Sequence, residues 1–308
     1  MTNSSSVISS AVPTIVFEYG KVMPFADLPS HSIALDGYVQ GPEQDPGRQR
    51  YSFDHHAGCS RLVTLATCQQ VAIALRLGLC VNHISKVFTN DIDADTVMAV
   101  WLLLHPERLD QKHVRKLVDR IGMTDSHGPV FPPHPLHSQL GPRWGSKEPQ
   151  SLEMLNGFLS VLDKWFETGE EPAPQPPRPG RGFGLKAVGK WEAVQTPDGF
   201  GPLYEAGYLA AALVTPANEA SYTWVIGKRS DLVPLAIGPA DGSKDRSGEY
   251  LPTILGALAR AEAEKGVSPK DNWGGGTSIG GSPRLPGGVG SRLSEAHVLE
   301  ILNQFTIG

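Results

Sequence analysis

The chain has 308 residues, of which 40% are hydrophobic and 19% charged, as in a globular protein of one large domain or two ordinary ones. The net charge of −5 argues against a strongly basic protein that binds long nucleic acids. The longest apolar run, VMAVWLLL at 97–104, falls short of the ~20 residues that a membrane span requires. The N-terminus carries no signal-peptide pattern, and three cysteines form no CxxC pair. These features predict reduced thiols and a cytoplasmic location.

Strands and helices alternate along the first half of the sequence, which predicts an α/β fold with a mainly parallel sheet flanked by helices on both faces. Apolar runs and helical spacing predict strands at 14–17, 31–36 and 84–89 and helices at 62–77, 96–104, 112–123 and 152–166. The second half predicts a smaller α/β domain, with strands at 204–214 and 222–226 and helices at 250–265 and 294–305.

A proline-rich stretch, EEPAPQPPRPGRG, separates the two halves. Proline neither donates to a sheet nor sits inside a helix, so this stretch predicts an extended, semi-rigid linker. The predicted organisation is a metal-binding domain at 1–169, a linker at 170–182 and a substrate-binding domain at 183–308.

Acidic residues and histidines gather at the ends of apolar stretches in the first half. Asp36 closes the strand SIALD, Asp54 precedes two histidines in YSFDHHAG, and FTNDIDADT carries Asp93 and Asp95. Ligands of open α/β sheets bind at the carboxyl ends of the strands, where carboxylates without basic neighbours repel one another. Divalent cations stabilise such a cluster, and this donor set suits Mn²⁺, Mg²⁺, Co²⁺ or Fe²⁺ better than structural Zn²⁺. Two such ions could activate a water and clamp an attacked phosphorus atom.

A plainer interpretation stays open for these residues. An aspartate at a strand end is commonly a helix cap or a turn residue. Asp91, Asp93 and Asp95 could simply cap the helix that begins near Thr96.

The stretch IALDGYVQGPEQDPGRQRYSFDHH resembles the DHH phosphoesterase superfamily, which includes RecJ-type exonucleases, nanoRNases, exopolyphosphatases and family II inorganic pyrophosphatases. The resemblance implies that Asp36 bridges two metal ions, that His55 binds one of them and that His56 contacts the substrate phosphate. The motif IGMTDSHG is similar to the family's later metal-binding aspartate, which points to Asp125. The resemblance covers roughly residues 36–125.

One departure from the family pattern stands out. The family begins with an Asp-x-Asp motif on its first strand, whereas TIVFEYGKVMPFADLP holds no such pattern. A similar segment, NDIDADTVMAVWLLL, follows the Asp-His-His instead. We therefore expect a rearranged strand order that brings Asp93 and Asp95 to the same site, so that the expected metal ligands are Asp36, Asp54, His55, Asp93, Asp95 and Asp125.

A glycine-rich segment, NWGGGTSIGGSPRLPGGVGSRLS, lies near the C-terminus and holds eight glycines. It does not match a Walker A loop, and it loosely resembles the GGGH-type substrate loop of the DHH-associated C-terminal domain, with Thr277 in place of the histidine. Glycine backbones and arginine forks suit phosphate oxygens, although a flexible loop is the alternative. The expected substrate-binding residues are Gly275, Gly276, Thr277, Ser282, Arg284 and Arg292.

The sequence as a whole predicts a metal-dependent phosphoesterase or phosphohydrolase with two Mn²⁺ or Mg²⁺ ions. His56 and His127 are the expected catalytic residues. The expected substrate is a small phosphorylated compound or a short oligonucleotide, with no membrane or long nucleic acid as partner; a homodimer is left open. Two alternatives remain: a non-catalytic nucleotide- or phosphometabolite-binding protein, and a metal-dependent enzyme that acts on a non-phosphate substrate.

Overall fold

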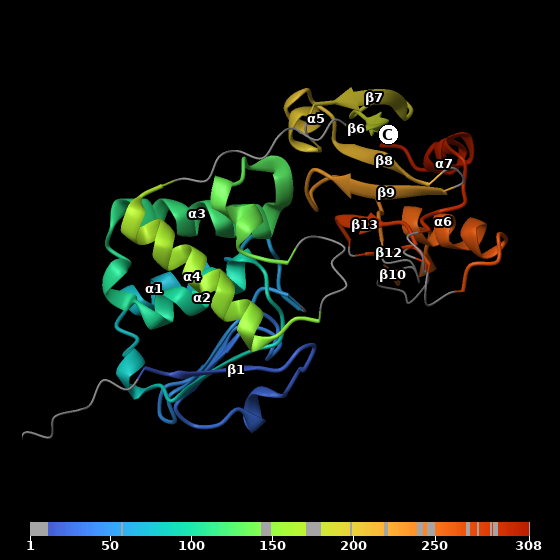
Figure 1. The fold of residues 1–308 in the computed structure, drawn as a ribbon. Coiled ribbons are helices and arrows are strands. Elements are labelled where there is room, and N and C mark those ends of the chain that lie inside the picture. Colours follow the sequence, from blue (N-terminus) through green and yellow to red (C-terminus); the bar gives the residue numbers. More distant parts are fainter. Residues whose placement is uncertain are drawn as a thin grey trace, which may run out of the picture. The chain divides into compact units, whose positions relative to one another are not determined.

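A computed structural model describes residues 12–56, 58–142, 149–170, 180–197, 199–218, 221–238, 243–244, 250–268, 272–275, 277–283, 285 and 289–307. The chain divides into two compact units, Met1–Gln175 and Pro176–Gly308 (Figure 1). Most of the predicted linker lies outside the described residues. Its predicted end at Gly182 is wrong, because Gly180 already begins a strand of the second unit.

The first unit is built on a five-stranded, mostly parallel sheet with the order β1-β5-β2-β4-β3. Only the edge strand β3 runs antiparallel to its neighbour. The strands are β1 (Thr14–Phe17), β2 (Ser32–Leu35), β3 (Glu43–Asp45), β4 (Arg50–Phe53) and β5 (Lys86–Thr89). The predicted α/β class and mainly parallel sheet are thereby confirmed.

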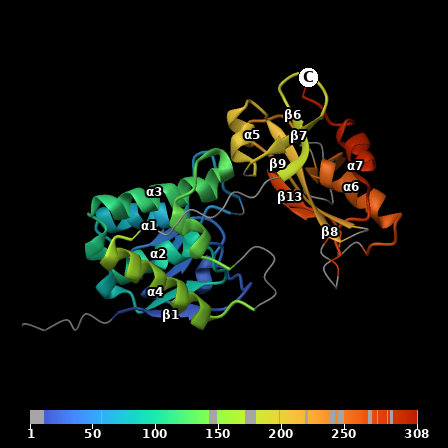
Figure 2. The same cartoon turned by 45° about the horizontal axis from the view of Figure 1, so that its top comes forward.

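Four helices cover one face of this sheet, as the views in Figures 1 and 2 agree. They are α1 (Thr67–Arg76), α2 (Ala94–Leu104), α3 (Lys112–His127) and α4 (Leu152–Thr168). Ile33 and Leu35 of β2 pack into the core beneath these helices, whereas Ala34 faces the opposite side. There the sheet is covered by Leu28, from the segment between β1 and β2, and by Tyr38, which follows β2. The expectation of helices on both faces is therefore wrong.

Helix α2 lies at the centre of the helical layer and contacts α1, α3 and α4. Residues 94–103 are all buried, which accounts for the apolar run in the sequence, since a helix that is apolar on every side must be enclosed. No helix of the described residues is long and apolar enough to cross a membrane.

The second unit holds a six-stranded antiparallel sheet with the order β12-β13-β9-β8-β6-β7. Its strands are β6 (Gly180–Leu185), β7 (Glu192–Thr196), β8 (Ala210–Asn218), β9 (Ser221–Lys228), β12 (Gly274–Gly275) and β13 (Ile279–Gly281). The short strands β10 (Ser243–Lys244) and β11 (Tyr250–Leu251) pair separately. The helices among the described residues of this unit are α5 (Gly201–Glu205), α6 (Ile254–Ala263) and α7 (Glu295–Leu302).

Two elements of this unit differ from their predictions. The predicted strand 204–214 begins as α5, which has Pro202 in its first turn, and Gly207 at φ 89° turns the chain before β8. The predicted helix 250–265 begins only at Ile254, because Thr253 caps it by accepting a hydrogen bond from Gly256 N.

Described parts of the glycine-rich segment belong to the sheet. Gly274–Gly275 and Ile279–Gly281 form a hairpin on the edge of β9, and Ser291 bridges to Tyr222. A Cβ added at Gly290 would lie 2.2 Å from the carbonyl oxygen of Tyr222. Close approach of two backbones therefore requires glycine at this position.

Replacement of Gly290 by alanine should lower the stability of the second unit by about 1–3 kcal/mol, because the added Cβ displaces the paired backbone. Gly274 is the matched control, since a Cβ there meets nothing within 4 Å. Denaturant unfolding followed by tryptophan fluorescence measures both variants. Equal stability of Gly290→Ala and Gly274→Ala would contradict the close approach.

Candidate metal centre

A cluster of carboxylates and imidazoles lies at the carboxyl ends of β2 and β4. Asp36 directly follows β2, and Asp54, His55 and His56 follow β4. Because β2 and β4 are parallel neighbours, their ends meet at the same edge of the sheet. The N-terminal turn of α2 and the last turn of α3 supply the remaining members, Asp95 and Asp125.

Asp36 is held in place through both its backbone and its side chain. Its φ of 52° lies in the left-handed region, and its N–H donates to the carbonyl oxygen of Phe53 at 2.9 Å. The hydroxyl of Thr67 donates to Oδ1 at 3.0 Å, and the hydroxyl of Thr96 donates to Oδ2 at 2.8 Å. Strained backbone of this kind concentrates at functional sites. The carboxylate of Asp36 is therefore fixed among β4, α1 and α2.

His55 is completely buried and points its ring at three carboxylates. Its Nε2 lies 2.8 Å from Oδ2 of Asp125, 3.7 Å from Oδ1 of Asp36 and 3.8 Å from Oδ2 of Asp95. Neither ring nitrogen has an aligned hydrogen-bond partner among the described residues, and Oδ2 of Asp125 also has none. Buried polar atoms without partners are costly and rare. The arrangement is that of a ligand set for a cation.

Asp95 and Asp93 have different partners at the start of α2. Asp95 accepts hydrogen bonds from the backbone N–H groups of Thr67 and Cys68, at 2.7 and 2.9 Å, and so caps α1 as well as facing His55. Asp93 is the N-cap of α2 and accepts from Thr96 N at 2.8 Å. Asp93 therefore caps α2, as the plainer interpretation predicts. Asp95 instead caps a different helix, α1.

Burial and mutual repulsion raise the pKa values of several of these carboxyl groups. Burial raises the pKa of Asp95 to about 7, and the charges of Asp125 and Asp36 add to the increase. Burial is also the main cause that raises the pKa values of Asp36 and Asp93. Burial also acts on Asp125, but the His55 ring and Arg61 outweigh it and lower the pKa of that carboxyl group. Such opposed shifts within one cluster are typical of functional sites.

His56 and Asp54 form a pair at the margin of the cluster. Nδ1 of His56 lies 2.8 Å from Oδ1 of Asp54 and 3.6 Å from Oδ1 of Asp36. The hydrogen bond to Asp54 raises the pKa of His56, and Asp36 adds to that effect. Asp54 also accepts from Gly41 N at 2.6 Å. The pKa of Asp54 is lowered, because these bonds outweigh its burial.

Two groups of side chains have the spacing of metal ligands, with donor atoms within 4.8 Å of one another: Asp36, His55 and His56; and His55, Asp95 and Asp125. Imidazole nitrogens combined with carboxylate oxygens suit Mn²⁺, Fe²⁺, Co²⁺ or Mg²⁺. Together with the unpartnered ring of His55, this donor set fits a divalent cation. Four of the six predicted ligands, Asp36, His55, Asp95 and Asp125, thus come together, with His56 as a fifth member; Asp54 and Asp93 lie outside these two groups.

The remaining predicted residues have other surroundings. The ring of His127 packs against that of Phe131, with centroids 5.7 Å apart. In the second unit Ser282 is buried, and its hydroxyl oxygen accepts a hydrogen bond from Trp224 N at 3.0 Å. Thr277 is exposed, with its hydroxyl 3.3 Å from a carboxylate oxygen of Asp231. Gly275 lies in β12, while Gly276 and Arg284 lie outside the described residues.

Arg292 belongs to a structural network around the buried carboxylate of Glu262. That carboxylate accepts hydrogen bonds from the hydroxyl of Ser291 at 2.6 Å, from Arg292 N at 2.7 Å and from Nε1 of Trp273 at 3.1 Å. The guanidinium of Arg292 donates to the carbonyl oxygen of Lys265 at 2.8 Å. These contacts fasten the end of the glycine-rich segment to α6.

Sequence reasoning missed three side chains that the structure places at the cluster. Thr67 and Thr96 orient Asp36, and Arg61 lies beside Asp125. A threonine at each helix start and an arginine shortly after the Asp-His-His were the available signals. Nothing in their local sequence shows that they meet Asp36 or Asp125, because the partners are far away along the chain.

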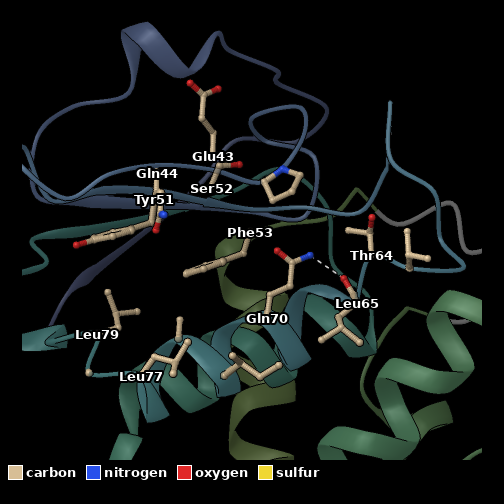
Figure 3. A pocket seen from close by; sticks show the side chains of 15 residues that line it. Glu43, Gln44, Tyr51, Ser52, Phe53, Thr64, Leu65, Gln70, Leu77 and Leu79 are labelled. Carbon is tan, nitrogen blue, oxygen red and sulfur yellow. Dashed lines mark hydrogen bonds between the residues drawn. The ribbon is translucent and has the colours of Figure 1, made fainter.

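An open pocket of about 710 Å³ lies beside the cluster, between β4 and α1 (Figure 3). The nearly parallel rings of Tyr51 and Phe53 line one side, with centroids 6.5 Å apart. Ile73 of α1 and Leu77, which follows that helix, line the other. The side-chain amide of Gln70 donates to the carbonyl oxygens of Asp54 and Leu65, at 2.9 and 2.6 Å. None of the fifteen lining residues belongs to the cluster, and none is cationic.

Comparison of the chain with protein-family models, with curated proteins and with solved structures gave no match. The geometry of the cluster is therefore the basis for the functional argument.

In the metal-free protein the acidic cluster should contribute less stability as the pH rises from about 4 to about 7. The folded-state pKa of Asp95, about 7, lies above its ordinary value of 3.8, so the folded state retains a proton that the unfolded state has already released. The raised pKa values of Asp36, Asp93 and His56 act in the same direction. Thermal unfolding of chelator-treated protein at a series of pH values measures this slope.

Asp95→Asn should flatten the slope, and so should added Mn²⁺, whereas Asp110→Asn should leave it unchanged because Asp110 is exposed and pairs with Arg76. The slope is the informative quantity, since the amide at position 95 also alters the bonds to α1. A slope that is identical in Asp95→Asn and wild type would show that Asp95 is ionised in the folded protein throughout.

Proposed function

We propose that the protein is a metal-dependent hydrolase that cleaves a phosphoester or phosphoanhydride bond of a small substrate. The observation that carries the proposal is the buried imidazole of His55, whose Nε2 faces the carboxylates of Asp36, Asp95 and Asp125 without an aligned hydrogen bond. The resemblance of the Asp-His-His segment to the DHH phosphoesterase superfamily agrees with it.

Two overlapping sets of side chains are available for divalent ions. His55 would hold an ion either with Asp95 and Asp125 or with Asp36 and His56. Mn²⁺ or Mg²⁺ bound in this way supplies Lewis-acid stabilisation of a phosphoryl oxygen and lowers the pKa of water.

The surrounding residues have distinct tasks in this proposal. Thr67 and Thr96 keep both oxygens of Asp36 in one orientation, so that little reorganisation is needed when an ion binds. Asp54 fixes the ring of His56 through Nδ1, and 40% of that side chain remains exposed at the margin of the cluster. His56 is therefore placed to meet a substrate, whereas His55 is enclosed.

The apolar pocket between β4 and α1 favours one alternative: a metal-dependent hydrolase that acts on a non-phosphate substrate with an apolar group. Its lining contains no cationic side chain that would attract a phosphate. A substrate panel that includes carboxylic esters and amides beside phosphate compounds separates the two proposals.

The decisive assay is release of inorganic phosphate in the presence of Mn²⁺, Mg²⁺ or Co²⁺. The panel comprises pyrophosphate, nucleoside mono-, di- and triphosphates, short oligonucleotides and small sugar phosphates. Removal of one ligand should reduce the rate by about 100-fold or more, because mutations of supporting residues alone typically cost 10–100-fold. Asp36→Asn and His55→Gln test the site, with Asp110→Asn as the matched control on the surface.

Absence of turnover with every metal and every substrate, or equal rates in His55→Gln and wild type, would contradict the hydrolase. Titration with Mn²⁺ by calorimetry then identifies what remains. Binding of nucleotides without turnover would support a non-catalytic binding protein, and a loss of metal binding in His55→Gln would still establish the metal site.

A further inference from the structure

Arg61 stands at the edge of the metal cluster on the segment between β4 and α1. Its Nη1 donates to the carbonyl oxygen of Asp125 at 3.0 Å and lies 3.9 Å from Oδ2 of the same residue. The side chain is 36% exposed. The guanidinium is thus anchored by one nitrogen while part of it faces solvent.

Exposure separates Arg61 and His56 from the rest of the cluster. The side chains of Asp36, Asp54, His55 and Asp95 are at most 3% exposed, and that of Asp125 is 19% exposed, against 40% for His56 and 36% for Arg61. The cluster therefore has a buried carboxylate interior and an exposed margin at which Arg61 and His56 lie.

The donors of Arg61 are only partly used. A guanidinium has five N–H groups in a planar fork, and within the described part of the chain only Nη1 makes a hydrogen bond. Divalent ions bound to the carboxylates would weaken the attraction between Asp125 and Arg61. A planar fork with unused donors beside a metal site matches the oxygens of a tetrahedral oxyanion.

We propose that Arg61 binds a phosphoryl oxygen of the substrate that projects from the metal centre toward solvent. This inference rests on the proposed hydrolase function and gives the phosphate contact to the first unit itself. In this proposal Arg61 takes the phosphate-binding role that the sequence assigned to Arg292, because the guanidinium of Arg292 donates to the carbonyl oxygen of Lys265.

A purely structural role makes a different prediction. The carbonyl of Asp125 lies in the last turn of α3 (Lys112–His127), where carbonyl groups lack helical partners and a cation is stabilising. If Arg61 only caps this helix, its replacement lowers the melting temperature without changing anion binding by the metal-loaded protein.

The test is calorimetric titration of the Mn²⁺-loaded full chain with inorganic phosphate. Arg61→Ala and Arg61→Gln should bind phosphate about 10–100-fold more weakly than wild type, which corresponds to the loss of one charge-assisted hydrogen bond. Mn²⁺ stoichiometry should be unchanged. Arg76→Ala is the matched control, because Arg76 is also partly exposed and pairs with Asp110 at 2.9 Å, away from the cluster; it should bind phosphate as wild type does.

Each outcome decides between the roles. Unchanged phosphate affinity in the Arg61 variants overturns the inference, and so does weaker Mn²⁺ binding with normal phosphate affinity at saturating Mn²⁺. The glutamine variant keeps an N–H donor, so it provides the measurement if the alanine variant does not fold. A wild-type protein that binds Mn²⁺ but no phosphate contradicts the proposed function, whereas a difference confined to the Arg61 variants bears on Arg61 alone.

Discussion

The first unit depends on the burial of several carboxylates at one point between its sheet and its helices. Asp36 accepts hydrogen bonds from Thr67 of α1 and Thr96 of α2, and Asp95 of α2 accepts from the first backbone N–H groups of α1. These bonds join the N-termini of α1 and α2 to each other and to the end of β2. Helix dipoles and N–H donors stabilise negative charge there, but they do not remove the repulsion that raises the pKa of Asp95 to about 7. A bound cation would offset that repulsion. The same carboxylates therefore hold the helices in place and form the proposed metal site.

Much of the first unit follows from local patterns in the sequence. The strand at Thr14–Phe17 and the start of the helix at Lys112 and that at Leu152 match their predictions, since apolar runs and helical spacing are local signals. Strand β4 was missed, because RYSF is short and only half apolar. Helix α1 begins five residues later than predicted at Thr67, where the carboxylate of Asp95 accepts its first N–H groups, and a cap supplied from 28 positions away leaves no local signal.

The glycines near the C-terminus show a second limit of sequence reasoning. Glycine allows both convergence of N–H groups on an anion and close contact between two backbones, and composition does not separate these uses. At Gly290 and Gly280 an added Cβ would collide with the carbonyl of Tyr222 and with the side chain of Leu255, respectively. Glycine is required at these two positions because of a neighbouring strand or helix, and not because of the conformation of the segment itself. The same holds for Ser291, whose hydroxyl bonds to the buried Glu262.

The spacing of Asp93 and Asp95 has a different meaning on a helix and on a strand. On a strand, residues two apart share a face, so an Asp-x-Asp pair presents both carboxylates to one site. Here the pair opens α2 as its N-cap and second helical residue, and about 200° of rotation separates such positions on a helix. Asp93 therefore caps α2 through Thr96 N, while Asp95 reaches His55 and α1. The segment therefore places one carboxylate, rather than two, beside the imidazole of His55. Asp125 of α3, only 2.8 Å from His55, completes the set from the other side.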